Sequence, residues 1–342
     1  MYRIGIIGCG KIAQVRHIPE YAASGKAEIK AFFDINYDRA KALAEKYGAT
    51  ACKSVDELLS LPLDAVSVCT SNNTHSQYAI AALKKGINVL CEKPMAISLD
   101  ECIEMDREAE KSGKILMIGQ NQRLTKAHQK ARKIVSSGEM GRVISFKTTF
   151  GHGGPETWSV DPGKNTWFFD KKKAVMGAMA DLGIHKTDLI DYILDDEVGA
   201  VTATVRTLDK KGPDGNLISV DDNAICIYEM RSGAVGVMSA SWTYYGAEDN
   251  STVLYMEKGI VKIYSDPDHS VTVIHDDGRV EYFDTDQIQT NDNQTSSGVI
   301  DEFILSLERG YAEISSHSVL PAMKAVFAAL ESSEKGKRIE IV

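Results

Sequence analysis

The regular alternation of short apolar runs with helical patterns over residues 1–120 is the feature that most constrains the fold. The apolar runs are Ile4–Ile7, Ile29–Phe33, Ala65–Cys69, Val89–Cys91 and Ile115–Ile118, and the helical patterns cover 12–24, 37–47, 55–60, 74–85 and 99–112. Strands that alternate with helices predict a parallel sheet covered by helices on both faces. Several runs are apolar throughout, as strands buried on both faces require. The sequence therefore predicts a doubly wound α/β domain over residues 1–120.

The pattern changes after residue 120, and residues 121–342 predict a second domain, as the length of 342 residues allows. A helix is expected over 126–137, a strand over 142–150, an irregular stretch over 151–173 and a helix over 177–194. Strands joined by turns follow over 198–284, then helices over 296–309 and 318–333 and a strand over 338–342. This order predicts an α+β domain with a large, open, mostly antiparallel sheet and helices on one face.

A glycine motif stands where the first strand meets the first helix. Residues Gly8-Cys9-Gly10-Lys11-Ile12-Ala13 match the pattern G-x-G-x-x-A. The first glycine permits the tight turn, the second lets the backbone approach a pyrophosphate, and the small third residue lets helix and strand pack closely. The free N–H groups of the helix N-terminus then face the phosphates. This context predicts a Rossmann-type dinucleotide site that includes Gly8, Gly10, Lys11 and Ile12, and an ordinary tight turn is the alternative.

The end of the second strand indicates which dinucleotide binds. Asp34 directly follows the run that ends at Phe33. A carboxylate at this point hydrogen-bonds the ribose hydroxyls of NAD and repels the extra phosphate of NADP. The sequence therefore favours NAD, while Arg39 keeps NADP open. Asp34 is also consistent with a helix N-cap, a role that Asn36 would serve equally.

The strand that ends at Cys69 is followed by Thr70-Ser71-Asn72-Asn73-Thr74-His75. Ligands of open parallel sheets bind outside the carboxyl ends of the strands. Thr70, Asn72 and His75 are therefore candidate cofactor contacts. His75 is expected in the first turn of the next helix, where a surface histidine without a role is the alternative.

Glu92-Lys93-Pro94 follows the next central strand and brings two opposite charges to the same crevice. A lysine there can polarise a hydroxyl or carbonyl oxygen and relay protons if burial lowers its pKa. Glu92 is expected to pair with Lys93 or with a cofactor ribose. Pro94 fixes the backbone, and an X-Pro bond in such a turn is sometimes cis. A solvated lysine at the start of a loop is the alternative.

A second site signal consists of Asp181, His185 and Asp188. The spacings i,i+4 and i,i+3 place all three residues on one face of a helix. An Asp–His pair suits general acid/base catalysis, because the carboxylate orients the imidazole and raises its basicity. A solvated polar face with an incidental histidine is the alternative.

Composition and residue spacing argue against several other functional classes. The net charge is −9 and no long basic run is present, so no nucleic-acid partner is expected. No apolar run reaches about 18 residues and the N-terminus does not resemble a secretory signal, so we expect a cytoplasmic protein without a membrane span. The six cysteines form no Cys-x-x-Cys pair and the histidines show no spacing such as His-Glu-x-x-His. Free thiols and no metal site are therefore expected.

Together these motifs resemble the glucose–fructose oxidoreductase / inositol dehydrogenase (Gfo/Idh/MocA) family. The matching segments are Gly8-x-Gly10-x-x-Ala13, Asp34, Thr70–His75, Glu92-Lys93-Pro94, Asn121–Arg123 and Gly177 with Asp181-x-x-x-His185-x-x-Asp188. The resemblance covers positions 8 to 188, and the rest of the chain fits the family in pattern only. It implies a nicotinamide-dependent dehydrogenase that acts on a sugar, inositol or related polyol. It also implies a homodimer or homotetramer formed through the C-terminal sheet.

The resemblance implies roles for individual residues as well. Lys93, Asp181 and His185 form the implied catalytic group. In it, His185 takes the proton from a substrate hydroxyl as hydride leaves the same carbon for NAD. Lys93 holds that oxygen, and Asp181 tunes His185 and binds a neighbouring hydroxyl. The implied further contacts are Asn121 for the cofactor, and Arg123, Trp158, Asn165, Trp167 and Asp188 for the substrate.

Two departures from the family pattern bear on substrate identity. The segment Met176-Gly177-Ala178-Met179-Ala180 has fewer glycines than the family usually shows, and Arg123 is followed by Leu124-Thr125-Lys126, without the usual aromatic residue and proline. Two other functions stay open at this point. One is a redox-neutral glycosidase that keeps NAD bound, and the other is a non-catalytic sensor that controls a partner protein. The intact Lys93, Asp181 and His185 set argues against the sensor.

Overall fold

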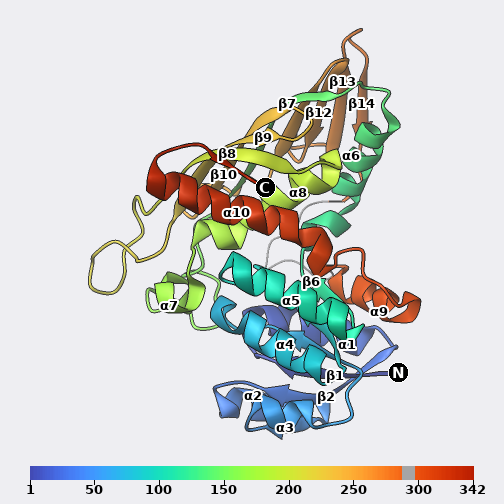
Figure 1. The fold of residues 1–342 in the computed structure, drawn as a ribbon, viewed down its shortest axis with the longest axis vertical. Coiled ribbons are helices and arrows are strands. Elements are labelled where there is room, and N and C mark those ends of the chain that lie inside the picture. Colours follow the sequence, from blue (N-terminus) through green and yellow to red (C-terminus); the bar gives the residue numbers. More distant parts are fainter. Residues whose placement is uncertain (287–296) are drawn as a thin grey trace. The chain divides into compact units, whose positions relative to one another are not determined.

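The computed structural model describes residues 1–286 and 297–342, which form two compact units (Figure 1). The first unit contains 1–120, 158–160 and 297–320, and the second contains 121–157, 161–286 and 321–342. The sequence places all of 121–342 in a second domain, so the grouping of 297–320 with the first unit differs from that expectation.

Hydrogen bonds explain why residues 297–320 group with the first unit. The N–H of Ile118 donates to the carbonyl oxygen of Ile314 at 2.9 Å, next to the last strand of the unit. The hydroxyl of Ser316 donates to Asp106 at 2.6 Å. These pairs join residues about two hundred positions apart in the chain, a separation that local sequence patterns do not encode.

The first unit is a parallel six-stranded sheet with the strand order β3-β2-β1-β4-β5-β6. Its strands are β1 (Tyr2–Ile7), β2 (Ala27–Phe33), β3 (Thr50–Cys52), β4 (Ala65–Val68), β5 (Asn88–Cys91) and β6 (Leu116–Ile118). Its helices are η1 (Ala13–His17), α1 (Ile18–Ala23), α2 (Tyr37–Tyr47), α3 (Val55–Leu59), η2 (Asn72–Thr74), α4 (His75–Lys84), α5 (Leu99–Ser112) and α9 (Val299–Arg309). This order is that of dinucleotide-binding sheets and confirms the predicted doubly wound fold.

Local chemistry sets the ends of these helices. The side chains of Asn36, Ser54 and Ser98 each accept the backbone N–H three residues later, as N-caps do. Gly48 and Gly113 end α2 and α5 in the left-handed conformation. The sequence missed β3, because three residues are too few for an apolar pattern to appear.

The second unit is a nine-stranded sheet with the order β14-β13-β12-β11-β7-β10-β9-β8-β15. Every neighbouring pair is antiparallel except β7 and β10, which are parallel. The strands are β7 (Val143–Gly151), β8 (Val198–Arg206), β9 (Asn223–Met230), β10 (Val235–Ser241), β11 (Thr252–Met256), β12 (Gly259–Ile263), β13 (Val271–His275), β14 (Val280–Phe283) and β15 (Ile339–Glu340). The predicted large, mostly antiparallel sheet is confirmed.

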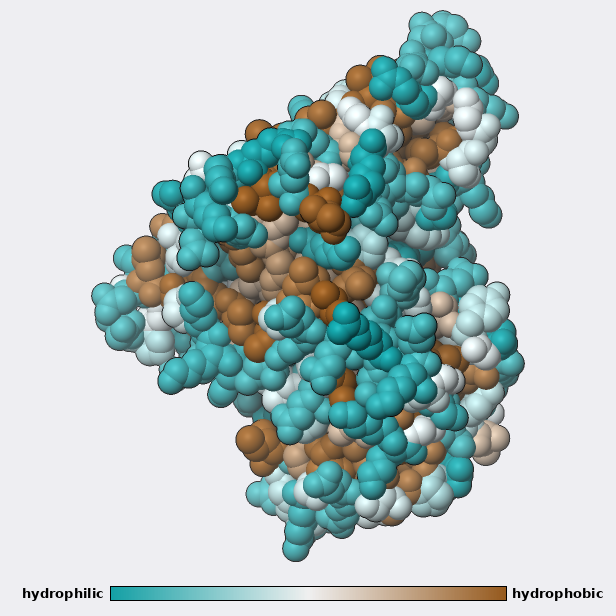
Figure 2. All heavy atoms as spheres, viewed as in Figure 1, coloured by the Kyte–Doolittle hydropathy of each residue, from teal (hydrophilic) through white to brown (hydrophobic). Residues whose placement is uncertain are grey.

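Helices α6 (Lys126–Ser137), η5 (Met179–Gly183) and α8 (Ile184–Leu194) of the second unit pack on one face of this sheet (Figure 1). The unit also contains η3 (Asn121–Leu124), η4 (Trp167–Phe169) and α7 (Lys171–Ala174), and α10 (Ser316–Lys335) includes residues of both units. Figure 2 views the molecule from the helix-covered side, where hydrophilic residues make up much of the surface of this unit. On the strands, Ile225, Ile227, Val235 and Val237 remain exposed.

No helix in the described ranges 1–286 and 297–342 combines the length and the apolar character needed to cross a bilayer.

Candidate active site

The glycine loop of the first unit leaves space where a phosphate would lie. Gly8 has a φ of +92°, and a Cβ there would come within 2.7 Å of the Cys69 carbonyl group. A glycine is therefore required here, where the chain just after β1 passes close to the chain just after β4. Gly10 differs, because a Cβ on it would meet nothing within 4 Å. Gly10 therefore borders open space at the start of the helix, as a pyrophosphate cradle requires.

Asp34 lies at the carboxyl end of β2 and closes this loop. Its carboxylate accepts the N–H of Cys9 at 2.7 Å and that of Asn36 at 2.8 Å. Arg39 lies 3.8 Å from the carboxylate as an ion pair. Asn36, and not Asp34, is the N-cap of α2. A carboxylate has about four acceptor positions, so Asp34 retains lone pairs for ribose hydroxyls. Together with the open cradle at Gly10, this arrangement fits NAD.

His75 connects the ends of two neighbouring strands. Its side chain is buried, with Nδ1 2.8 Å from the Pro94 carbonyl oxygen and Nε2 3.1 Å from that of Thr70. Burial lowers the pKa of His75, and the two carbonyl oxygens act in the opposite direction. His75 thus ties the loop after β4 to the turn after β5. Asn72, also buried, lies in the 3₁₀ turn just before it.

Glu92 is an ionised carboxylate buried below the turn that contains Lys93. His17 Nε2 lies 2.8 Å from its Oε1, and Arg16 lies at 3.8 Å. Burial alone would raise the pKa of Glu92, but the hydrogen bond from His17 and the nearby positive charges lower it to about 2. The backbone N–H of Lys93 donates to the same carboxylate at 3.3 Å. The Lys93–Pro94 bond is cis.

Arg16 and His17 were not singled out in the sequence. They belong to η1, a π-helical turn, and such turns often occur at functional sites. His17 is fully buried, although it occupies a position of ordinary helical sequence. A histidine a few residues beyond the glycine loop is the only local signal that would have suggested it.

In the second unit, Asp181 is held by Trp242. The indole Nε1–H of Trp242 donates to Asp181 Oδ2 at 3.0 Å, and both side chains are buried. The Nε2 atom of His152 lies 3.9 Å from the same oxygen. His152 Nδ1 accepts the N–H of Gly154, which places the proton of a neutral His152 on Nε2, facing Asp181. Asp181 lies in η5, a second π-helical turn.

His185 lies in α8, which directly follows the turn of Asp181. It is buried beside the aromatic ring of Phe150, with ring centroids 6.1 Å apart. The next residue, Lys186, is fully buried and donates from Nζ to the carbonyl oxygen of Asn250 at 3.1 Å. Burial lowers the pKa of Lys186 to about 7, while the charges of Asp249 and Glu248 act in the opposite direction. The helix therefore buries a catalytic candidate and a lysine in adjacent positions.

Asp188 pairs with Arg123. Arg123 Nε donates to Asp188 Oδ2 at 2.7 Å, and a second short contact joins Nη2 to Oδ1. Both side chains are buried, so this bidentate ion pair joins η3 to α8. Of the three residues on the predicted helical face, Asp181 accepts a hydrogen bond from Trp242, His185 lies beside Phe150, and Asp188 pairs with Arg123.

The irregular stretch contains the other predicted substrate contacts. Trp167 stacks on Phe168 with ring centroids 3.9 Å apart, and Phe168 meets Trp242 edge-on at 6.5 Å. Trp167 thereby belongs to the aromatic group around the partner of Asp181. Asn165 is exposed, and Trp158 lies in the short 158–160 segment of the first unit.

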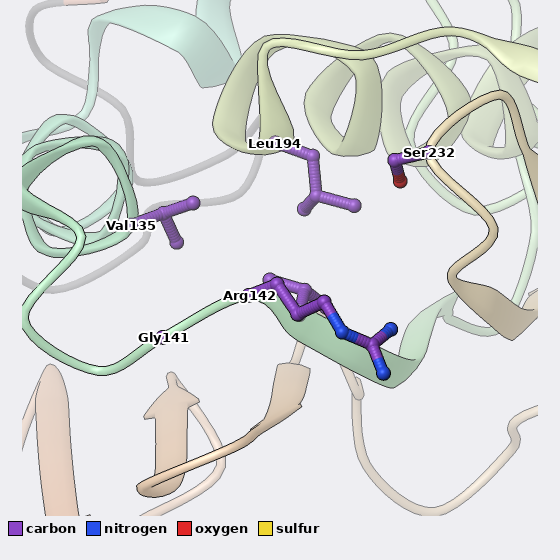
Figure 3. A pocket seen from close by; sticks show the side chains of 6 residues that line it. Val135, Gly141, Arg142, Leu194 and Ser232 are labelled. Atoms are coloured by element: carbon purple, nitrogen blue, oxygen red, sulfur yellow. The ribbon is translucent and has the colours of Figure 1, made fainter.

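The second unit also contains a pocket (Figure 3). It is lined by Val135, Gly141, Arg142, Val143, Leu194 and Ser232, near the C-terminal ends of α6 and α8. None of the predicted site residues lines it.

Two family models match the chain in succession. The model described as "Oxidoreductase family, NAD-binding Rossmann fold" matches residues 2–120, and the "GFO/IDH/MocA C-terminal domain" matches residues 128–262. Myo-inositol 2-dehydrogenase of Thermotoga maritima is 31% identical over 276 residues, 80% of this chain and 77% of that protein. Glucose-6-phosphate 3-dehydrogenase of Bacillus subtilis is 32% identical over 66% of this chain and 63% of its own length.

A solved structure of levoglucosan dehydrogenase in complex with NADH has the same fold, with a TM-score of 0.87 at 22% identity over 100% of this chain and 99% of that one. The parallel sheet, its glycine loop and the family match define an NAD-binding oxidoreductase. The chain belongs to the Gfo/Idh/MocA family. The resemblance, the enzyme class and the NAD cofactor expected from the sequence are thereby confirmed.

Proposed function

We propose that this protein is an NAD-dependent dehydrogenase that oxidises a hydroxyl of a sugar, inositol or related polyol. The observation that carries the proposal is the buried Asp181 carboxylate, which accepts a hydrogen bond from the indole N–H of Trp242. Asp181 lies on the same helical segment as His185. A fixed carboxylate and an imidazole on one segment are suited to proton transfer at a hydroxyl. Two relatives support the substrate class, because their names specify inositol and glucose 6-phosphate.

Each residue of the catalytic group has a stated task in this proposal. His185 takes the hydroxyl proton as the C–H bond of the same carbon breaks, which leaves a carbonyl group on the substrate. Lys93 holds the oxygen as negative charge develops on it, and Asp181 favours the protonated form of His185. NAD, when bound, accepts the hydride. The Lys93–Pro94 turn is held by Glu92 and His75, and this support positions Lys93 for its task.

We propose NAD rather than NADP as the preferred cofactor. The Asp34 carboxylate lies at the end of β2, where the ribose hydroxyls of a dinucleotide bind in such folds. Arg39, the residue that would favour NADP, is ion-paired with Asp34. The charge of Arg39 is therefore partly neutralised, and the extra ribose phosphate of NADP would meet the Asp34 carboxylate.

We also propose that the protein is a homodimer or homotetramer that covers the open face of the nine-stranded sheet. Ile225, Ile227, Val235 and Val237 lie on β9 and β10 and are 40–54% exposed. Ile227 and Val237 are direct cross-strand neighbours, so their side chains form a continuous apolar surface. Contiguous apolar patches of this kind usually mark interfaces.

A panel assay tests the activity. Purified protein is mixed with NAD or NADP and with inositols, aldoses and sugar acids, and the absorbance of the reduced cofactor is followed. We expect NADH to form with at least one polyol. In Lys93→Ala and His185→Ala variants that still bind NAD, turnover should fall by about a thousandfold. The exposed variant Lys41→Ala is the control. Release of sugar from a glycoside without net NADH would favour the glycosidase instead. Absence of turnover on every substrate, with a stoichiometric partner protein, would favour the sensor.

A further inference from the structure

We infer that Asp221 is a positioning residue for the proposed active site, which it serves by holding the π-helical turn that carries Asp181. The inference rests on the proposed dehydrogenase function for its consequence in catalysis. Asp221 contacts residues 177–179, and all four residues belong to the second unit.

Asp221 accepts three consecutive backbone N–H groups, those of residues 177–179, at the start of the helical segment from η5 through α8, here called the site helix. Asp221 Oδ1 accepts the N–H of Gly177 at 2.7 Å, and Oδ2 accepts that of Met179 at 2.7 Å. The carbonyl oxygen of Asp221 accepts the N–H of Ala178 at 2.9 Å. The first N–H groups of a helix have no partner inside it, so Asp221 supplies the partners that the segment from η5 through α8 needs. Its negative charge also lies at the positive end of that segment.

The two backbones are in direct contact at this point. A Cβ on Gly177 would lie 1.8 Å from the Asp221 carbonyl oxygen, a distance that no side chain tolerates. Only a glycine therefore fits at position 177 in this structure. The close approach leaves the turn little freedom to shift relative to Asp221.

Asp222, the next residue in the chain, holds Trp242, the hydrogen-bond donor to Asp181. The backbone N–H of Trp242 donates to the carbonyl oxygen of Asp222 at 2.8 Å, and the indole of Trp242 donates to Asp181. The Asp222 carboxylate itself accepts the N–H groups of residues 208, 209 and 210 at 2.7–2.8 Å. Asp221 and Asp222 therefore fix Asp181 from two sides, through its own backbone and through its hydrogen-bond donor.

Asp221 acts through other residues and not on the substrate. Its carboxylate accepts the backbone N–H groups of Gly177 and Met179, and the residue is 9% exposed. A shift of about 1 Å in a catalytic group can cost about a hundredfold in rate. Loss of one acceptor at position 221 would let the turn move and would displace Asp181 from Trp242.

The test is the Asp221→Asn variant, which keeps the shape of the side chain but replaces one acceptor oxygen with an NH₂ group. We expect kcat to fall about a hundredfold while the KM for NAD, which binds to the first unit, stays within about twofold. Asp214→Asn is the matched control, because Asp214 also accepts a backbone N–H, that of Asn216, but is exposed on a turn. Its kinetics should equal those of the wild type.

A second readout does not depend on activity. The indole N–H resonance of Trp242, assigned with Trp242→Phe, reports its hydrogen bond to Asp181. We expect this resonance to move in Asp221→Asn and to stay in Asp214→Asn. A wild-type kcat with an unmoved resonance overturns the inference, and so does a lower kcat with an unmoved resonance. If the wild-type protein shows no dehydrogenase activity but the resonance moves in Asp221→Asn, the proposed function is wrong and the positioning role of Asp221 still stands. If Asp221→Asn does not fold, Asp221→Glu, which keeps both oxygens, is measured in the same way with the same expected outcomes.

Discussion

His17 and Glu92 are 75 residues apart in the chain, yet His17 Nε2 lies 2.8 Å from Glu92 Oε1 in the interior of the first unit. The carboxylate joins the π-helical turn after the glycine loop to the turn that contains Lys93. It also accepts the backbone N–H of Lys93. The two parts of the proposed cofactor crevice are therefore supported by one buried charge.

Replacement of Glu92 by glutamine should destabilise the protein by about 3 kcal/mol at pH 7, because it removes one member of a buried ion pair. The pKa of Glu92 is near 2 in the folded protein against 4.5 ordinarily. Its contribution to stability is therefore present above pH 4.5 and is lost as the pH falls toward 2. Urea unfolding at several pH values measures both effects. The exposed variant Glu45→Gln should behave as the wild type, and equal stability of Glu92→Gln and Glu45→Gln would contradict the role assigned to Glu92.

Substitution of Asp34 by serine should weaken the preference for NAD. Loss of a charged acceptor for the ribose hydroxyls is expected to cost about 1.5–3 kcal/mol, roughly a ten- to hundredfold fall in kcat/KM for NAD. The loss for NADP should be smaller, because the repulsion of its extra phosphate disappears. The ratio of kcat/KM for the two cofactors measures the effect, and Asp38→Ser, at an exposed position on α2, is the control. An unchanged ratio would show that Asp34 does not select the cofactor.

Lys186 should make stability depend on pH on the alkaline side. Its pKa is lowered to about 7 in the fold from 10.5, so between these values the unfolded chain binds a proton that the folded chain does not. Stability should therefore rise with pH across this window, by at most about 1.4 kcal/mol per pH unit from this group. In Lys186→Met the rise should be flatter, as followed by urea unfolding at pH 7, 8 and 9. Lys41→Met, at an exposed position, should retain the wild-type slope, and identical slopes in both variants would refute the assignment.

A lysine in place of Ile227 should break the proposed oligomer. The side chain lies next to Val237 on the open sheet face and is 46% exposed, so a charge there would be buried in an interface at high cost. Light scattering after gel filtration should show a dimer or tetramer for the wild type and a monomer for Ile227→Lys. Thr202→Lys, on the exposed face of β8, tests how far the interface extends. A monomeric wild type would dispose of the proposal.

Several site features were within reach of the sequence because they depend on neighbouring residues. The glycines at positions 8 and 10, the aspartate at the end of β2 and the Lys-Pro turn after β5 each follow an apolar strand directly. Strand ends and turns obey local rules, so their positions were predictable. The parallel direction of the strands in the first sheet follows from the same alternation of strands and helices.

The helix of Asp181 shows what local spacing does not encode. The i,i+4 and i,i+3 spacings predict that Asp181, His185 and Asp188 share one face, and they do not reveal that Asp181 lies in a π-helical turn, in which N–H groups bond to carbonyl groups five residues earlier. Asp188 is taken up by Arg123, 65 residues away in the chain. The pattern of the helix carried no information about either change.

The sequence by itself determined the two sheets in outline, the dinucleotide loop and the candidates Lys93, Asp181 and His185, because apolar periodicity and turn chemistry act between near neighbours. Only the tertiary structure decided the partners of the buried charges: His17 for Glu92, Trp242 for Asp181 and Asp221 for the start of the site helix. A buried polar group must find a partner, since leaving it unpaired costs about 1–3 kcal/mol. Which partner it finds depends on the side chains that packing brings within about 3 Å, and that is a property of the folded chain.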